Sequence, residues 1–351
     1  MRIQLNWLLA VILLTLQSNY TLAQSSNDTA QCSYSCCGTD LTPAGVMISD
    51  VHTKNEWMVS YRYMGMYMHD LLLGTASQNK EEVFAKYLMS PDRMNMQMHM
   101  LMGMYGITDR LTIMAMFNYQ FNSMDMSMYT ANHVHGSTTM TSPTHTIKTT
   151  GLGDIKLHAL YGVIQRNTYQ FVLSLGASIP TGSIYEKGNA NDPMYPNKHY
   201  PYNMQLGSGS VEILPAITYM YRKNSLAFSA SVSDIYRTTF NALDYKLSNE
   251  FNCNAWVAYQ WLPFISSSFR LDGTFSGTIQ GRDSDQSPLL EPGTDPLSYG
   301  TEKINAYIGT SFHFKQVHKL GIEYGMPLYQ YVYGIQLKQK YIISASWAYT
   351  F

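Results

Sequence analysis

Methionines spaced two residues apart are the feature of this sequence best suited to chemistry. The longest uninterrupted run is Met94, Met96, Met98, Met100, Met102 and Met104. The same spacing recurs upstream in Met64, Met66 and Met68, and downstream in Met124, Met126 and Met128. Residues two apart share one face of a β-strand, and thioether sulfur is a soft ligand that suits Cu(I) and, by the same softness, Ag(I). One hypothesis is therefore a soft-metal site.

Strand geometry limits how such a site can form. Each residue rises about 3.3 Å, so sulfurs two residues apart lie about 7 Å from one another along the strand. A site therefore needs ligands from neighbouring strands, which lie about 4.8 Å apart, or from a loop that closes on itself. Histidines near the methionines add imidazole, which also binds copper. The candidate ligands are Met64, Met66, Met68, His99, Met124, Met126, Met128, His133, His135, Met140 and His145.

A purely structural role for the methionines is the alternative, because Met fills irregular apolar space. In the stretch 111–122, Met114 and Met116 share a face with Asn118 and Gln120, which favours an orientation toward a polar interior. The orientation of the run from 94 to 104 stays open. Its opposite face begins with the polar residues Asn95, Gln97 and His99 and ends with Leu101 and Tyr105.

Alternation of polar and apolar residues, the period of β-strands, extends over most of the chain. About twelve such stretches are evident. Most are longer than typical soluble strands and match the roughly 9 to 11 residues that cross a bilayer at a tilt. They are residues 55–68, 95–105, 111–122, 151–164, 168–179, 209–222, 225–235, 245–261, 262–278, 303–314, 319–327 and 336–351.

Connections between these stretches alternate between long and short. Residues 123–150 and 180–208 are long connections, whereas 165–167 and 223–224 are short. In an up-and-down barrel every second connection lies at the same rim, and outer-membrane barrels have long extracellular loops and short periplasmic turns. The sequence therefore predicts an all-β fold, an antiparallel up-and-down transmembrane β-barrel of about twelve strands formed by residues 55–351.

The first 23 residues have the pattern of a signal peptide. Arg2 precedes an apolar stretch at 7–16, and Thr21-Leu22-Ala23 resembles a cleavage site. The apolar stretch is shorter than the about 20 residues of a transmembrane helix. Residues 24–54 are predicted to form an irregular periplasmic arm. Its cysteines, Cys32, Cys36 and Cys37, are expected to form one disulfide of unassigned pairing or, alternatively, to bind a soft metal.

Composition agrees with export to a membrane. Charged residues make up only 13% of the chain, the formal net charge is -1, and Tyr is unusually frequent at 28 residues. No basic stripe is present to neutralise phosphates, so nucleic-acid binding is not expected. Aromatic residues near strand ends, such as Trp57 and Trp347, are typical of interfacial girdles. The last stretch ends on Phe351, which resembles the C-terminal signal recognised by the outer-membrane assembly machinery.

Short motifs between residues 105 and 183 resemble a known family. Gly151-Leu152-Gly153-Asp154 opens one strand, Pro180-Thr181-Gly182 ends the next, and Tyr105–Leu111 forms a tight turn. Together they resemble the outer-membrane barrel transporters named for the meta pathway of phenol degradation. The resemblance implies a monomeric, porin-like barrel that admits small, often apolar molecules. Glycine and proline also have structural roles in turns and strand ends, which is the interpretation we favour for these residues.

The expected function is a channel or transporter for small molecules in the outer membrane of a Gram-negative-type cell. Its expected partners are membrane lipid, the assembly machinery and a small-molecule or metal-ion solute. The alternative is a copper or silver binding or tolerance factor of that membrane, and a barrel without transport is a third possibility. No catalytic constellation, phosphate-binding loop or paired zinc motif is evident, so we expect no enzyme and no required cofactor, with Cu(I) or Ag(I) as the candidate ion.

Overall fold

The computed structural model describes residues 40–351 except 49, 129, 135–136, 142–143 and 316. For the remaining residues between 130 and 141 it describes only the backbone. The predicted signal peptide and the cluster of Cys32, Cys36 and Cys37 lie outside the described residues, so both remain predictions. Cys253 forms no disulfide in the part that is described. Among the same residues, no helix is both long and apolar enough to cross a membrane.

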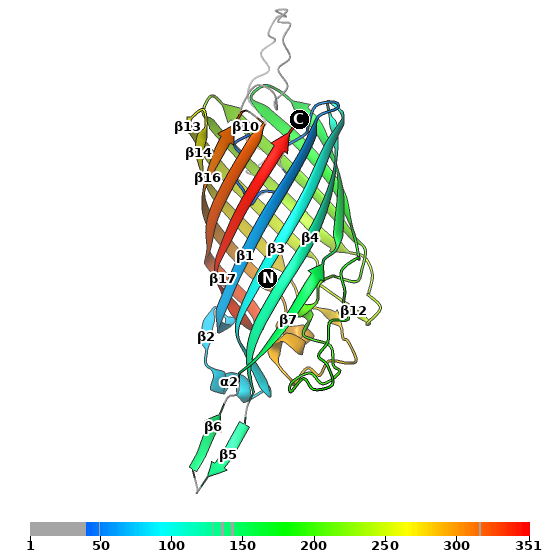
Figure 1. Cartoon of the computed structure of the whole chain (residues 1–351), viewed down its shortest axis with the longest axis vertical. Helices are drawn as coiled ribbons and strands as arrows, with labels where there is room; N and C mark the ends of the chain where they lie inside the picture. The colour runs from blue at the N-terminus through cyan, green and yellow to red at the C-terminus, as the bar shows by residue number, and fades with distance from the viewer. Residues whose placement is uncertain (1–39, 49, 129, 135–136, 142–143, 316) are drawn as a thin grey trace, which may run out of the picture. The chain divides into compact units, whose positions relative to one another are not determined.

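One antiparallel sheet closes on itself to form a barrel of eleven labelled strands, with two further short strands attached to it (Figure 1). The order along the barrel is the order along the chain, which confirms the up-and-down arrangement. The strands are β1 (Trp57–Gly74), β3 (Met89–Thr108), β4 (Leu111–Met128), β8 (Ile155–Gln165), β9 (Tyr169–Ile179), β10 (Glu212–Lys223), β11 (Leu226–Arg237), β13 (Glu250–Leu262), β14 (Ile265–Ser276), β16 (Thr301–Phe314) and β17 (His318–Thr350).

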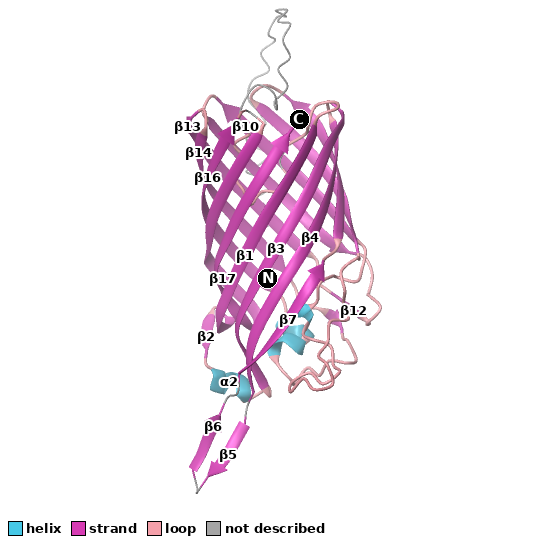
Figure 2. Cartoon of the chain, viewed as in Figure 1, coloured by secondary structure: helices cyan, strands magenta, loops and turns pink. Residues whose placement is uncertain are grey.

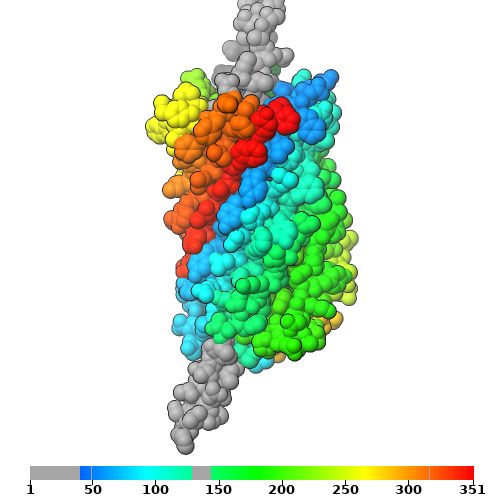
Figure 3. Space-filling view, in the orientation of Figure 1, coloured from blue at the N-terminus to red at the C-terminus, as the bar shows by residue number. Residues whose placement is uncertain are grey.

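Pairing between the first and last strands closes the sheet. The register runs from Met58 opposite Thr350 to Gly74 opposite Val332. At the rim, Trp57 N donates to Phe351 O (2.8 Å) and Phe351 N donates to Trp57 O (2.9 Å). Figure 3 shows the two strands, blue and red, lying directly against each other. The closing strand predicted to end at Phe351 is therefore the strand that completes the barrel.

The last strand, β17, folds back on itself. Its first arm pairs with β16 and its second arm with β1. Tyr324 and Tyr341 stack with centroids 6.2 Å apart, which residues so distant in one straight strand could not do. Gly334 has a positive φ of 76° at the reversal. β17 therefore supplies two crossing segments, which explains why about twelve were predicted although eleven strands are labelled.

One crossing segment is interrupted at Gly153 and Asp154. β7 (Thr144–Leu152) pairs with the loop-side half of β4, and β8 pairs with the other half. Gly153 N donates to Asn118 O across the break (2.9 Å). A Cβ on Gly153 would lie 2.5 Å from the Asn118 amide nitrogen, so a side chain at this position would require that amide group to move. The predicted strand 151–164 is therefore two strands.

The remaining elements belong to the long connections. These are β2 (Ala76–Gln78), α2 (Lys80–Phe84), β5 (Thr130–Val134), β6 (Ser137–Thr141), β12 (Tyr245–Lys246), β15 (Gln280–Gly281), η1 (Tyr202–Met204), η2 (Pro292–Thr294) and η3 (Pro296–Ser298). Figure 2 shows the helices and longer loops at the barrel end away from the C-terminus. Several strands extend further toward that end than predicted, because ladder pairing continues: β4 reaches Met128 through its bonds to β3 and β7.

The barrel sorts its side chains in the opposite sense to a soluble sandwich. Large apolar residues on the outward face are solvent-exposed, including Leu101, Phe117, Leu175 and Ile308. Polar residues on the inward face are buried, including Thr112, Ser174, Thr218, Ser266 and Asn305. An apolar exterior and a partly polar interior match the pattern of transmembrane barrels.

Asp154 holds the loop end of the barrel together. Its carboxylate accepts hydrogen bonds from Gly182 N (2.9 Å), Ser208 N (2.8 Å) and Ser208 Oγ (2.8 Å). Thr181 Oγ1 donates to Gly153 O (2.9 Å). Two of the three motifs on which the family resemblance is based therefore contact each other, and their residues serve the fold.

We expect the Asp154→Ala variant to lower the free energy of unfolding by at least about 3 kcal/mol, since hydrogen bonds to a charged group contribute about 1.5–3 kcal/mol each and three buried donors lose their acceptor. Urea unfolding in detergent measures this. The control is Asp285→Ala, which removes an exposed ion pair with Lys198 (2.9 Å) and a longer contact with His199 (3.9 Å), and should cost less than about 1 kcal/mol. Equal losses in both variants would contradict the assignment.

Candidate binding site in the barrel interior

Methionines form one wall of the barrel interior. On the inward faces of β1, β3 and β4, within residues 58–68, 94–104 and 112–128, every apolar side chain is Met. The outward faces of the same stretches contain Leu, Ile, Val, Phe, Tyr and Ala but no Met. The orientation predicted for Met114 and Met116 is confirmed, since both are buried.

The run from 94 to 104, whose orientation the sequence left open, also faces inward. Met94 and Met104 are 1% and 3% exposed, whereas Leu101 on the other face is 52% exposed. Met102 and Met104 pack with Val51, Leu160 and other residues in a buried cluster. The polar residues of the opposite face, Asn95, Gln97 and His99, therefore point outward. They lie in the half of β3 nearer the long loops.

Register places these methionines in rows across neighbouring strands. Met68 lies opposite Met94, and Met94 lies opposite Met124, so one row crosses three strands. Two further pairs lie farther from the long loops along the same strands, Met66 with Met96 and Met64 with Met98. Directly opposed residues in an antiparallel sheet have Cβ atoms about 4.5–5.5 Å apart, so each sulfur has another within side-chain reach.

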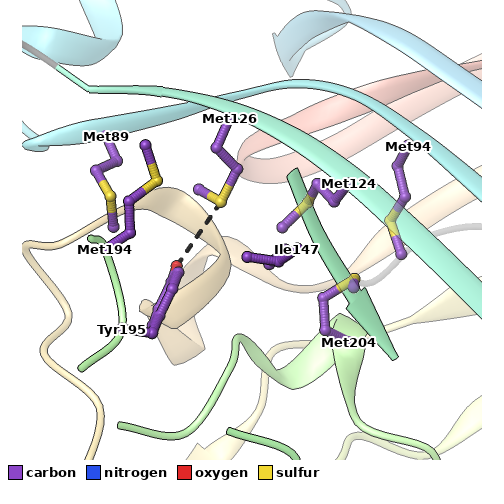
Figure 4. Close-up of a cluster of buried hydrophobic side chains, with 8 residues drawn as sticks. All are labelled: Met89, Met94, Met124, Met126, Ile147, Met194, Tyr195 and Met204. Carbon is purple, nitrogen blue, oxygen red and sulfur yellow. Dashed lines mark hydrogen bonds between the residues drawn. The ribbon is translucent and has the colours of Figure 1, made fainter. Parts of the chain in front are cut away.

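The row formed by Met68, Met94 and Met124 lies nearest to the long loops. Met94, Met124 and Met126 pack with Met194 and Met204, which come from the connection between β9 and β10 (Figure 4). The remaining members of this cluster are Met89, Ile147 and Tyr195, with Met68, Met96 and Met128 packed against it. Tyr195 Oη donates to Met126 Sδ (3.9 Å) and Asn203 Nδ2 donates to Met94 Sδ (3.7 Å). This cluster therefore packs the loop-side end of the methionine wall against the connection between β9 and β10.

The predicted ligands are only partly brought together. Met64, Met66, Met68, Met124, Met126 and Met128 all belong to the methionine wall. His145 on β7 lies opposite Met126, and its Nε2 is 3.5 Å from Asp192 Oδ2. The backbones of His133 and Met140 lie in the β5–β6 hairpin, and their side chains are not described, while His135 lies outside the described residues.

His99 is separated from the other predicted ligands. It lies on the outward face of β3, where Tyr61 Oη and His99 Nδ1 are 2.6 Å apart. Its ring also contacts Tyr63 and Phe121, with centroids 5.3 and 5.4 Å away. A strand of period two cannot turn residue 99 and its neighbours 98 and 100 to the same face. His99 therefore belongs to an aromatic group on the exterior.

The opposite wall of the interior is polar and charged. Arg270 donates from Nε to Glu323 Oε1 (3.0 Å) and from Nη2 to Glu323 Oε2 (3.2 Å), and its guanidinium lies 3.7 Å from the Tyr307 ring centroid. Asn254 Nδ2 donates to Asp272 Oδ1 (3.0 Å) nearby. Because the buried arginine is paired with carboxylate, this wall offers polar groups without a large net charge.

Residues 40–56, here called the strap, lie against the interior wall at the end of the barrel where Phe351 lies. Leu41 packs with Met220 and Trp256, and Val51 packs with Met102. Arg62 Nη2 donates to Val46 O (2.7 Å), and His52 N donates to Thr112 Oγ1 (2.8 Å). A cavity of about 520 Å³ remains between the strap and the wall.

The sequence predicted only an irregular periplasmic arm for residues 24–54, and the insertion of the strap into the barrel was not predicted. The alternation of apolar residues Leu41, Val46 and Val51 with polar ones has no strand or helix period, so the sequence contained no clear signal of it. Met194 and Met204 were missed for a similar reason, because isolated methionines in a long loop show no periodicity.

A buried carboxyl group anchors the loops over the methionine cluster. Glu291, fully buried, accepts a short hydrogen bond from Tyr195 Oη. Burial in apolar surroundings raises the pKa of Glu291 to about 8, although the bond from Tyr195 opposes the shift. Burial also raises the pKa of Tyr195 well above its ordinary value. At neutral pH the pair is therefore uncharged and suited to an apolar environment.

The fold and this interior define a class of protein, the closed antiparallel β-barrel with an apolar exterior and a mixed interior. No protein-family model matches the sequence, and no curated protein matches it. The family resemblance suggested by the short motifs therefore remains a prediction.

Among solved structures, an outer membrane channel from Pseudomonas putida F1 is similar to this chain. The TM-score is 0.58 at 15% identity, covering 89% of this chain and 100% of that chain. Weaker likenesses include the KdgM porin (TM-score 0.40, 8% identity, 84% and 99% coverage) and the Pseudomonas putida toluene transporter TodX (0.41, 8%, 86% and 90%). At these identities the likeness concerns the fold alone.

We expect the loops over the methionine cluster to loosen as pH rises. An unfolded chain ionises Glu291 near 4.5, whereas the folded chain keeps the proton until about pH 8. Between these values the folded state binds more protons, so its stability is highest at low pH, falls as pH rises, and levels off above about 8. Limited proteolysis of residues 180–211 and 277–300 between pH 6 and 9.5 measures this.

The matched control is Glu291→Gln, which keeps a group able to accept the bond from Tyr195 but cannot ionise. Cleavage of this variant should vary much less with pH. If the wild-type protein and the variant show the same pH profile, Glu291 is not the group that controls the loops.

Proposed function

We propose that the chain is an outer-membrane channel of a Gram-negative-type cell, through which small solutes cross. The observation that carries the proposal is the closed sheet with exposed apolar side chains outside and buried polar side chains inside. The fold of the similar Pseudomonas putida channel agrees with it. A monomer suffices, because closure leaves the barrel complete within one chain.

The polar wall supports passage of solutes. Amides, hydroxyls and the paired Arg270 and Glu323 line one side, so a solute would meet hydrogen-bonding groups rather than an apolar core. Such a role requires no catalytic residues. The direct test is single-channel conductance in planar bilayers, together with uptake of small solutes by reconstituted vesicles. Flux no greater than in protein-free vesicles would refute the proposal.

The strap must move or leave for larger solutes to pass, because it occupies the mouth of the barrel. Gly106 allows the backbone of the strap to approach β3 closely. A Cβ at this position would lie 1.9 Å from the Thr53 backbone oxygen and 2.9 Å from that of His52. Backbone atoms cannot turn aside as a flexible side chain can, so a side chain here displaces the strap.

We expect Gly106→Val to raise single-channel conductance by displacing the strap from the wall. Gly103→Val is the matched control on the same strand, since a Cβ at Gly103 meets nothing within 4 Å. Both variants place a β-branched residue in β3, so any effect on strand propensity is shared. Equal conductance of the Gly106 variant and the wild type would mean that the strap does not limit passage.

A further inference from the structure

The methionine wall contains an arrangement that an apolar lining does not require. If only apolar bulk were needed, Leu, Ile and Val would fill the inward faces as they do the outward faces of the same strands. Instead, Met occupies every apolar position inside and none outside within these stretches. Met has no advantage as a strand former over the β-branched residues. The distribution therefore requires a property that Met has and the branched residues lack, which is its adaptable shape or its thioether sulfur.

Four of these methionines form a block on two neighbouring strands. Met64 lies opposite Met98, and Met66 lies opposite Met96, with no irregularity of register between the strands. The backbone positions of the four residues form a rectangle. It measures one strand spacing, about 4.8 Å, across the strands and two residues, about 7 Å, along them. Met has three rotatable side-chain bonds, so sulfurs at these spacings can converge on one small ion. The four side chains are half-buried, unlike the packed cluster above them.

A polar group beside the block lacks a partner. Asn122 lies opposite Met96 on β4 and is 3% exposed. Its Nδ2 donates to Thr149 Oγ1 (3.3 Å), but its Oδ1 has no hydrogen-bond partner within the described residues. Buried carbonyl oxygens are normally satisfied. A cation at the block, acting directly or through a bound water, would supply the missing interaction.

The nearest positive charge is directed away from the block. Arg62 lies one row below, opposite Met100. Its guanidinium donates to Val46 O of the strap (2.7 Å), and Glu323 lies near enough to interact with it. Thioethers carry no charge, so a monovalent ion bound by them keeps its charge of +1, and the pairing of Arg62 with the strap keeps a second positive charge from being directed at the block.

We propose that Met64, Met66, Met96 and Met98 bind Cu(I), with Ag(I) as its chemical equivalent, inside the barrel. Thioether sulfur selects soft ions of this kind over hard cations. Met68, Met94 and Met124 above and Met102, Met104 and Met114 below continue the ladder of sulfurs along the wall. The inference deepens the channel function proposed above, on which it rests for passage of the ion, by naming a soft monovalent cation as a solute.

The test is titration of the full-length, refolded protein with Cu(I) in competition with a chromogenic chelator. The background replaces Cys32, Cys36, Cys37 and Cys253 by Ser, because thiolates would compete for the ion. The test variant changes Met64, Met66, Met96 and Met98 to Leu, which keeps apolar bulk and usually costs less than about 1.5 kcal/mol per site. The control variant changes Met220 and Met326, outside the ladder, to Leu.

We expect the wild-type background and the control to bind Cu(I) with X-ray absorption dominated by sulfur scattering, and the four-Leu variant to bind at least about tenfold more weakly, a change of about 1.4 kcal/mol. Two double variants, Met64→Leu with Met98→Leu and Met66→Leu with Met96→Leu, serve if the fourfold variant does not fold. Unchanged affinity in the folded variants, or absorption spectra lacking sulfur, would overturn the inference.

Potassium conductance of the same proteins separates this inference from the channel function. A wild-type protein that conducts potassium but binds no Cu(I) would remove the metal site and leave the channel. A protein that binds Cu(I) through these methionines without conducting would keep the site and remove the channel. Loss of Cu(I) binding with unchanged potassium conductance in the four-Leu variant would support both.

Discussion

Closure of the sheet is the constraint on which the rest of the structure depends. β1 and the second arm of β17 are the two edges of the sheet, and their pairing gives the backbone groups of both edges a partner. The pairing extends to the rim, where Trp57 and Phe351 form reciprocal hydrogen bonds. In an apolar surrounding an open edge would leave unsatisfied backbone groups, each costing several kcal/mol. Closure also divides every strand into one inward and one outward face, and so determines the composition of both.

The interior that results is filled unevenly. β1, β3 and β4 contribute thioethers, while the strands on the other side contribute hydroxyls, amides and the Arg270–Glu323 pair. Met adapts its shape to irregular space, so one wall can pack against loops at one end and against the strap at the other. Packing of this kind is compatible with the soft-ligand role proposed for the thioethers, because neither use excludes the other.

Both ends of the barrel depend on buried polar contacts rather than on apolar packing alone. Asp154 joins three segments at the loop end, and Glu291 with Tyr195 fixes the loops above the methionine cluster. At the other end, Arg62 and Thr112 bind the backbone of the strap. Buried polar contacts are costly to leave half-made, so segments held in this way have few alternative positions.

The sequence by itself determined the strands, the up-and-down order and which residues share a face, because the strand period is two and the connections alternate in length. Met64, Met66 and Met68 are therefore grouped by their spacing alone. The sequence does not determine which way the methionines from 94 to 104 face. The opposite face of this strand begins with polar residues and ends with apolar ones, so its composition suits either the interior or the exterior. Only closure, which turns Leu101 outward and Met102 inward, decided it. The same closure separated His99 from the methionines, since sequence proximity does not place adjacent residues of a strand on one side.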